Sequence, residues 1–183
     1  EFPKAGKLEA FNTDGLRSLL KTIDAPNMKE KTLRYPGHIE LMRVMRETGF
    51  FGEEAITVRG ASVRPLDVTS ALLFPKWKAD AGESEFTVLR VIVEGTKNGR
   101  GSRVQFDLFD ENDPVRGMSS MARTTGFPCV IIAKMLAEGR IKSHGVLTPE
   151  LIARQTGVFE HVVAELNTRN VRITQTQTER PIC

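Results

Sequence analysis

The clearest pattern of apolar and polar positions lies in two alternating runs, residues 86–94 and residues 102–110. Their apolar members on one face are Leu89, Val91, Val93, Val104, Phe106 and Leu108. Between the runs stands Lys97-Asn98-Gly99, and Asn-Gly accepts the positive φ angles that a tight hairpin turn requires. The pattern therefore predicts an antiparallel β-hairpin with one apolar face and one mixed face.

Apolar residues at helical spacing predict further elements along the chain. Helices are expected over residues 14–23, 39–48, 64–75 and 119–138, after Thr148, and around residues 159–166. Short strands are expected over residues 7–12, 28–33 and 171–178, and residues 51–62 are expected to form a loop. Thr13 suits the N-cap of the first helix. Pro128 implies that the longest helix either kinks there or begins near Thr125. Together these elements predict an α+β fold with an open mixed, largely antiparallel sheet and helices on one face; the last strand is expected at an edge.

Composition narrows the class of protein. The chain has 183 residues, of which 27% are charged and 40% hydrophobic, and its net charge is only +3. The basic residues are scattered, so we expect no nucleic-acid partner. Two cysteines, Cys129 and Cys183, make no disulfide framework, which favours a reducing cytoplasm. No apolar run is long enough to span a membrane, and no His/Cys cluster has the spacing of metal ligands, so no metal is expected.

One short block concentrates polar chemistry at a corner of the chain. Leu33-Arg34-Tyr35-Pro36-Gly37-His38 follows a predicted strand and opens a predicted helix. A guanidinium, a phenol and an imidazole together suit a small ligand that carries a carboxylate. The alternative is structural: Arg34 in a salt bridge, Tyr35 packed in a core, and His38 filling the helix start.

Four stretches of the chain resemble the saccharopine dehydrogenase family and occur in the same order as in that family. They are residues 10–19, 33–38, 63–68 and 119–128. The resemblance is to the branch of the family that includes lysine 6-dehydrogenase. The resemblance implies an NAD(P)-binding Rossmann domain, interrupted by an α+β domain that binds substrate and forms dimers. Residues 1–183 resemble that second domain alone. The nearest approach to a phosphate-binding G-x-G-x-x-G turn is Gly99-Arg100-Gly101, but Val104 stands where the third glycine would be. We therefore expect the Rossmann domain to be absent from this chain, and the chain itself to bind neither NAD nor NADP.

The resemblance also assigns roles to individual residues. Arg34 would hold the substrate carboxylate, and His38 would donate to substrate or move a proton. The remaining candidates are Tyr35, Phe11, Asn12 and Thr13 near the substrate, and Thr124, Thr125 and Gly126 near the nicotinamide or substrate. Alternatively, Asn12, Thr13, Thr124 and Thr125 cap helices. Asp67, beside Arg64, is expected to be an ion-pair partner.

The function implied is that of the substrate-binding and dimerisation domain of an NAD(P)-dependent oxidoreductase. Its substrate would be a lysine-like amino acid, oxidised at a CH–NH group, and the fragment alone would be inactive. The alternative is a non-catalytic module that binds a ligand or forms dimers. We expect a homodimer built partly on the mixed face of the hairpin. That face carries Phe86, Val88, Arg90, Ile92, Glu94 and Phe109.

Overall fold

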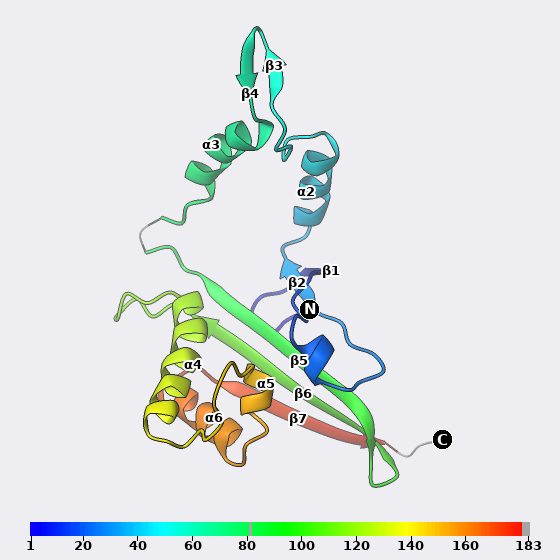
Figure 1. Ribbon diagram of the computed structural model, residues 1–183, viewed down its shortest axis with the longest axis vertical. Helices are drawn as coiled ribbons and strands as arrows, with labels where there is room; N and C mark the ends of the chain where they lie inside the picture. The colour runs from blue at the N-terminus through cyan, green and yellow to red at the C-terminus, as the bar shows by residue number, and fades with distance from the viewer. Residues whose placement is uncertain (81, 181–183) are drawn as a thin grey trace. The chain divides into compact units, whose positions relative to one another are not determined.

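The computed structural model describes residues 1–80 and 82–180 and divides into two compact units (Figure 1). The first unit comprises Glu1–Leu20 and Ala25–Glu83. The second comprises Lys21–Asp24 and the chain from Ser84 onward. Cys183 lies outside the described residues, and Cys129 is a free, exposed cysteine. The expectation of a single domain over residues 1–183 stays a prediction.

Two short antiparallel pairs and two helices make up most of the first unit. The strands β1 (Glu9–Asn12) and β2 (Lys31–Arg34) pair with each other, and α2 (His38–Glu47) follows β2 directly. The strands β3 (Ile56–Val58) and β4 (Ala61–Val63) form the second pair, and α3 (Pro65–Trp77) follows. The predicted ion pair is present in the first turn of α3, where Arg64 and Asp67 lie 2.5 Å apart.

The structure corrects the predicted loop over residues 51–62, because β3 and β4 form a hairpin there. Ile56, Thr57 and Val58 are β-branched and favour extended backbone. Arg59 and Gly60 both have positive φ, 50° and 85°, which is the geometry of a tight hairpin turn. The arginine in that turn hid the signal, since Asn or Asp is the residue usually paired with glycine.

The first predicted helix is also much shorter than expected. Only α1 (Leu19–Thr22) is helical, and Arg17 has a left-handed φ of 40° that interrupts any earlier turn. Thr13 does not cap this helix: its hydroxyl donates to the carboxylate of Glu30 and lies 3.2 Å from the hydroxyl of Thr32.

A three-stranded antiparallel sheet forms the second unit, in the order β5–β6–β7. The strands are β5 (Phe86–Lys97), β6 (Arg100–Glu111) and β7 (Ile173–Arg180). Asn98 and Gly99, with φ of 52° and 71°, make the predicted turn. Leu89 pairs with Leu108 and β7 lies at an edge, so the predicted hairpin and edge strand are confirmed.

The helices α4 (Ser120–Ala137), α5 (Pro149–Ile152) and α6 (Val158–Thr168) accompany this sheet (Figure 1). Its core joins the sheet to all three helices through side chains that are almost fully buried. These are Leu108, Ile131, Met135, Ile141, Ile152, Val158, Leu166 and Val171.

The α+β class is confirmed, although the described strands form three small antiparallel sheets rather than one. No helix among the described residues is long and apolar enough to cross a bilayer.

A buried ion pair connects α4 to the end of β6. The Arg123 guanidinium donates from Nε and Nη2 to the two carboxylate oxygens of Asp110, each at 3.1 Å, and both side chains are at least 94% buried. Arg123 also donates to the Arg169 carbonyl at the end of α6. The Ser120 hydroxyl, fully buried, lies 2.9 Å from Asp110 and from the Thr87 hydroxyl of β5. This network therefore holds β5, β6, α4 and α6 together at one end of the sheet.

We expect Arg123→Ala to lower the free energy of unfolding by about 3–5 kcal/mol, because it leaves the Asp110 carboxylate buried without its counter-charge. Lys134→Ala, in the same helix, is the control. Lys134 is mostly exposed and pairs with Glu138 at 3.7 Å, so its loss should cost about 0.5 kcal/mol or less. Urea denaturation followed by circular dichroism measures both. Equal losses in the two variants would mean that the buried pair has no special role.

Candidate functional site

The pairing of β1 with β2 places the predicted substrate residues on two different faces. Glu9 pairs with Arg34, and Phe11 pairs with Thr32. Because side chains alternate along a strand, Phe11 and Arg34 share one face, while Asn12 lies on the other. Thr13 continues the first face, since its hydroxyl meets that of Thr32. The structure thus brings Phe11, Thr13 and Arg34 together and separates Asn12 from them.

The guanidinium group of Arg34 lies at the end of this face. Its side chain is exposed, and its Nη1 donates to the Leu33 carbonyl at 2.7 Å. Among the described residues of its unit, no carboxylate forms an ion pair with it. The salt bridge that would make Arg34 purely structural is therefore missing, and one edge of the guanidinium remains open to a ligand carboxylate.

The start of α2 adds a second feature at the same corner. Gly37 precedes the helix with a left-handed φ of 91°, and its amide donates to the Glu9 carboxylate at 3.1 Å. His38 is the first residue of α2 and is half-buried. Its side chain makes no hydrogen bond to any other described residue, so it does not cap the helix. Tyr35 is 60% exposed and is not packed in a core.

Two acidic residues on this side of the β1–β2 pair, Glu30 and Glu9, were missed by sequence reasoning. The Glu30 carboxylate accepts hydrogen bonds from the Thr13 hydroxyl and from the Gly15 amide. A Cβ on Gly15 would come within 2.6 Å of the Glu30 side chain, so a larger residue at position 15 would require that side chain to move. Glu30 comes two residues before Thr32, so its side chain lies on the same face as that of Thr32. Only the pairing of β1 with β2 shows that this is also the face of Phe11 and Arg34. Glu9 was missed for the same reason, because its partner Gly37 lies 28 residues away.

The predicted cofactor-proximal residues do not start a helix. The helix α4 begins at Ser120, with the Ser119 hydroxyl capping it by accepting from the Ala122 amide at 3.0 Å. Thr124, Thr125 and Gly126 lie in the second turn, and the Thr124 hydroxyl donates back to the Ser120 carbonyl. Pro128 lies inside α4, so the alternative in which the helix begins near Thr125 is wrong. Neither the free amides nor the capping role expected of these residues is present; their nearness to a cofactor stays a prediction.

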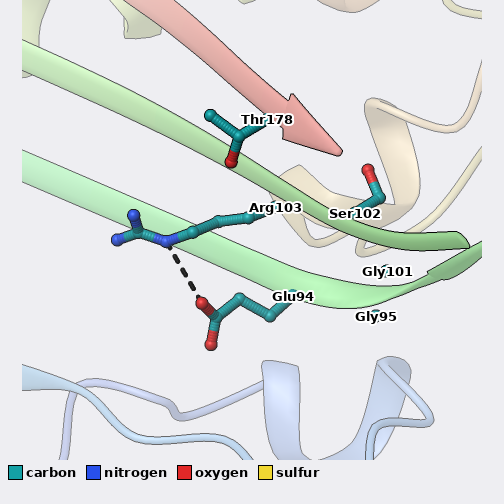
Figure 2. A pocket seen from close by; sticks show the side chains of 6 residues that line it. All are labelled: Glu94, Gly95, Gly101, Ser102, Arg103 and Thr178. Carbon is teal, nitrogen blue, oxygen red and sulfur yellow. Dashed lines mark ion pairs between the residues drawn. The ribbon is translucent and has the colours of Figure 1, made fainter. Parts of the chain in front are cut away.

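A cavity of about 330 Å³ lies at the turn end of the three-stranded sheet (Figure 2). Its lining residues are Glu94, Gly95, Gly101, Ser102, Arg103 and Thr178. The Arg103 guanidinium meets the Glu94 carboxylate at 3.1 Å, as the dashed line in Figure 2 shows. All six residues belong to the second unit, so this cavity does not include the predicted substrate residues of β1, β2 and α2.

Polar contacts continue from this cavity along the same face of the sheet. Arg103 also donates to Gln105, and Gln105 donates to Asp107, which pairs with Arg90 at 2.5 Å. Burial works to raise the pKa of Asp107, but the hydrogen bonds from Gln105 and Arg90 outweigh it and hold that pKa below its ordinary value of 3.8. The carboxylate is therefore ionised at neutral pH and suits charge pairing rather than proton transfer.

Comparison with known protein families identifies the chain. The model of the saccharopine dehydrogenase C-terminal domain matches residues 1–171. The chain belongs to this family. Within the saccharopine dehydrogenase C-terminal domain, Gly99 lies in the turn between β5 and β6, and Arg100 and Gly101 begin β6, so this stretch joins two strands rather than a strand and a helix. This turn thus does not fit the pyrophosphate of a dinucleotide, which needs the amides of a helix start beside it. That the chain binds neither NAD nor NADP stays a prediction.

Relatives of this saccharopine dehydrogenase domain include several named enzymes. The chain is 27% identical over 156 residues to carboxynorspermidine synthase of Vibrio cholerae. It is 30% identical over 110 residues to saccharopine dehydrogenase [NADP(+), L-glutamate-forming] of Schizosaccharomyces pombe, and 31% identical over 105 residues to that of Pyricularia oryzae. These matches cover 82%, 60% and 55% of the chain, but only 38%, 24% and 22% of the relatives. The chain therefore corresponds to less than half the length of each.

Gly37 is expected to be needed for the corner that carries Arg34 and His38. Space around it is open, so a substitution meets only backbone strain from the left-handed φ. We expect Gly37→Ala to cost about 1–2 kcal/mol in the free energy of unfolding, and Gly37→Asn to cost less because asparagine tolerates this conformation. Urea titration followed by Trp77 fluorescence and circular dichroism compares the two. An alanine variant as stable as wild type would show that the corner does not depend on this glycine.

Proposed function

We propose that this chain is the substrate-binding and dimerisation domain of an NAD(P)-dependent oxidoreductase. Its substrate class is a lysine-like amino acid or related amine, oxidised at a CH–NH group. Lysine, saccharopine and carboxynorspermidine-like compounds all belong to that class. Family membership supports the general chemistry, and two relatives carry NADP(+) in their names. The nicotinamide would be held by a part of the protein outside this chain.

The observation that carries this proposal is the open guanidinium of Arg34. It stands at the end of a face shared with Phe11 and Thr13, and it has no carboxylate partner among the described residues of its unit. An arginine fork binds a carboxylate through two parallel hydrogen bonds and keeps its charge at any physiological pH. Arg34 would therefore fix the amino-acid end of the substrate, with Phe11 providing apolar contact.

His38 would accept the proton that is released when an amine is oxidised to an imine. The imidazole begins α2, four residues after Arg34, and it is half-buried without a hydrogen-bond partner among the described residues. A neutral imidazole can accept such a proton near neutral pH. Tyr35 would add a hydroxyl at the rim of the same corner. Localisation in the cytoplasm is part of the proposal, because the two cysteines form no disulfide framework in the sequence.

A module that only forms dimers is the second candidate function, and one observation favours it. The strand β5 lies at an edge of its sheet and exposes apolar side chains on both faces, with Leu89 at 47%, Ile92 at 45% and Val93 at 58%. Exposed apolar groups gathered on one strand mark a surface that another molecule covers. Both functions are compatible, since the proposed substrate corner lies in the first unit and β5 lies in the second.

Arg34→Lys is expected to reduce kcat/KM roughly 30- to 1000-fold in the full-length enzyme. A lysine keeps the charge but loses the two-pronged contact, which corresponds to about 2–4 kcal/mol of transition-state stabilisation. The assay is NAD(P)-dependent oxidation of lysine and of saccharopine. Arg46→Lys is the matched control, because Arg46 is an exposed arginine of α2. The melting temperature should change little in either variant. Near-wild-type activity of Arg34→Lys, or activity lost only through unfolding, would make Arg34 structural.

The isolated chain is expected to bind neither NAD nor NADP. The motivation is that Gly99 and Gly101 stand where β5 turns into β6, so no helix start follows them to bind a pyrophosphate. Isothermal titration of the 183-residue chain with each cofactor is the measurement. Binding in the micromolar range would place the nucleotide site within these residues and would contradict our interpretation of the domain.

A further inference from the structure

The face of the β1–β2 pair that carries Arg34 has opposite charges at its two ends. Along the second strand and the residue before it, Glu30, Thr32 and Arg34 occupy alternate positions and therefore share this face. Phe11 of β1 pairs with Thr32, and the Thr13 hydroxyl donates to Glu30 one step further along the same register. The face thus has a carboxylate at one end, a guanidinium at the other, and an aromatic ring between them.

The Glu30 carboxylate is held in place but not neutralised. Its side chain is half-buried, and the Thr13 hydroxyl and the Gly15 amide both donate to one of its oxygens, Oε2. The other oxygen, Oε1, accepts no hydrogen bond from the residues that the structure describes, and no lysine or arginine among them forms an ion pair with Glu30. Lys31 is adjacent in the chain, but it occupies the alternate position and points to the other face. An anchored carboxylate with one open oxygen is suited to bind a cation from outside the chain.

Arg34 and Glu30 are too far apart to pair with each other, but one ligand can reach both. Four residues of extended backbone separate their Cα atoms by about 13 Å. A molecule with about six to eight bonds between a carboxylate carbon and an ammonium nitrogen is about 8–10 Å long when extended. Hydrogen bonds of about 2.9 Å at both ends bring the distance from guanidinium to carboxylate to about 14–16 Å. Arginine and glutamate side chains are long enough to lean outward by this small difference.

We propose that Glu30 binds an ammonium group at one end of the substrate whose carboxylate binds Arg34, and that Glu30 thereby determines which amines the enzyme accepts. This inference rests on the proposed function and adds a specificity-determining residue to it. The substrate lies extended along β2, with its hydrocarbon over the Phe11 ring. Glu9, which pairs with Arg34 across the strands, accepts from the Gly37 amide instead, so the guanidinium stays available to the substrate.

Binding at Glu30 also distinguishes the amine that is not oxidised. Hydride leaves a carbon only when the attached nitrogen has a lone pair to form the C=N bond, and an ammonium group has none. The reacting CH–NH group therefore lies nearer to Arg34, where His38 begins α2 and can accept the proton. The substrate class narrows to secondary amines that have a carboxylate on one side of the reacting nitrogen and a primary ammonium on the other. Saccharopine and carboxynorspermidine have this form, whereas lysine has no secondary amine.

The test compares substrates that differ only in the distal ammonium group. One pair is saccharopine and N-(5-carboxypentyl)glutamate, which lacks the primary amine of the lysine part. The second pair is carboxynorspermidine and its analogue without the terminal amino group. Oxidation of each is measured with the full-length enzyme and NAD(P). Wild type is expected to prefer the ammonium-bearing member roughly 10- to 100-fold in kcat/KM, as loss of a charge-assisted hydrogen bond implies.

Glu30→Gln should reduce this preference to about twofold or less, because the amide keeps the shape of the side chain but has no charge. The change should come mainly from a higher KM for the ammonium-bearing substrate, with kcat/KM for the neutral analogue nearly unchanged. A ratio of two kcat/KM values within one variant does not depend on how much of the enzyme is folded. The ratio therefore remains informative even if the variant is less stable.

Glu54→Gln is the matched control, because Glu54 is an exposed glutamate of the same unit, and it should keep the wild-type preference. A wild type without preference, an unchanged preference in Glu30→Gln, or an equal loss with both members of a pair would make Glu30 structural. Oxidation of lysine but of neither secondary amine would overturn the proposed orientation. All these outcomes leave the proposed function standing. A wild-type enzyme that oxidises none of the compounds would instead refute the proposed function itself.

Discussion

The register of the β5–β6 hairpin determines which side chains the second unit can bury. Asn98 and Gly99 set this register by accepting positive φ angles, and twelve residue pairs follow from it. A slip of one residue would turn Leu108 and Asp110 away from α4 and carry Asp107 and Phe109 into the core. The Arg123 guanidinium would then be buried without a partner. The apolar core, the buried ion pair and the cross-strand pairs Arg90–Asp107 and Glu94–Arg103 thus depend on one tight turn.

The first unit follows a different principle, because it has little buried interior. Thr69 is its one fully buried side chain among the described residues, and its hydroxyl donates to the Phe50 carbonyl. Hydrogen bonds between residues distant in the chain define the corner at Arg34: the Glu9 carboxylate accepts from the Gly37 amide, and the Glu30 carboxylate accepts from the Thr13 hydroxyl. Such contacts fix the backbone while leaving polar side chains accessible. If the corner binds substrate as we propose, its weakly packed support would allow it to adjust when the ligand arrives.

Sequence reasoning succeeded where a pattern was both local and strong. The hairpin, the α4 helix with Gly139 after its end, and the Arg64–Asp67 pair each depend on residues close together in the chain. Sequence reasoning failed where the structure depends on a contact between residues far apart in the chain, or on a residue with an unusual backbone conformation. Arg17, in a left-handed conformation, shortened α1. The faces of β1 and β2 could not be assigned from the sequence, because the two strands are separated in the chain and only their pairing sets Asn12 apart from Phe11.

The two edges of the three-stranded sheet differ in the side chains that they offer. Residues 174–178 of β7 alternate threonine with glutamine, so neither face of that strand has an apolar side chain along this stretch. Threonine keeps a strand extended because it is β-branched, yet another strand that paired there would bury almost no hydrocarbon. The opposite edge, β5, carries valine, leucine and isoleucine. Uncontrolled strand addition, the first step toward fibrils, is therefore a hazard at one border of the sheet only, and the chain is protected against growth in both directions at once.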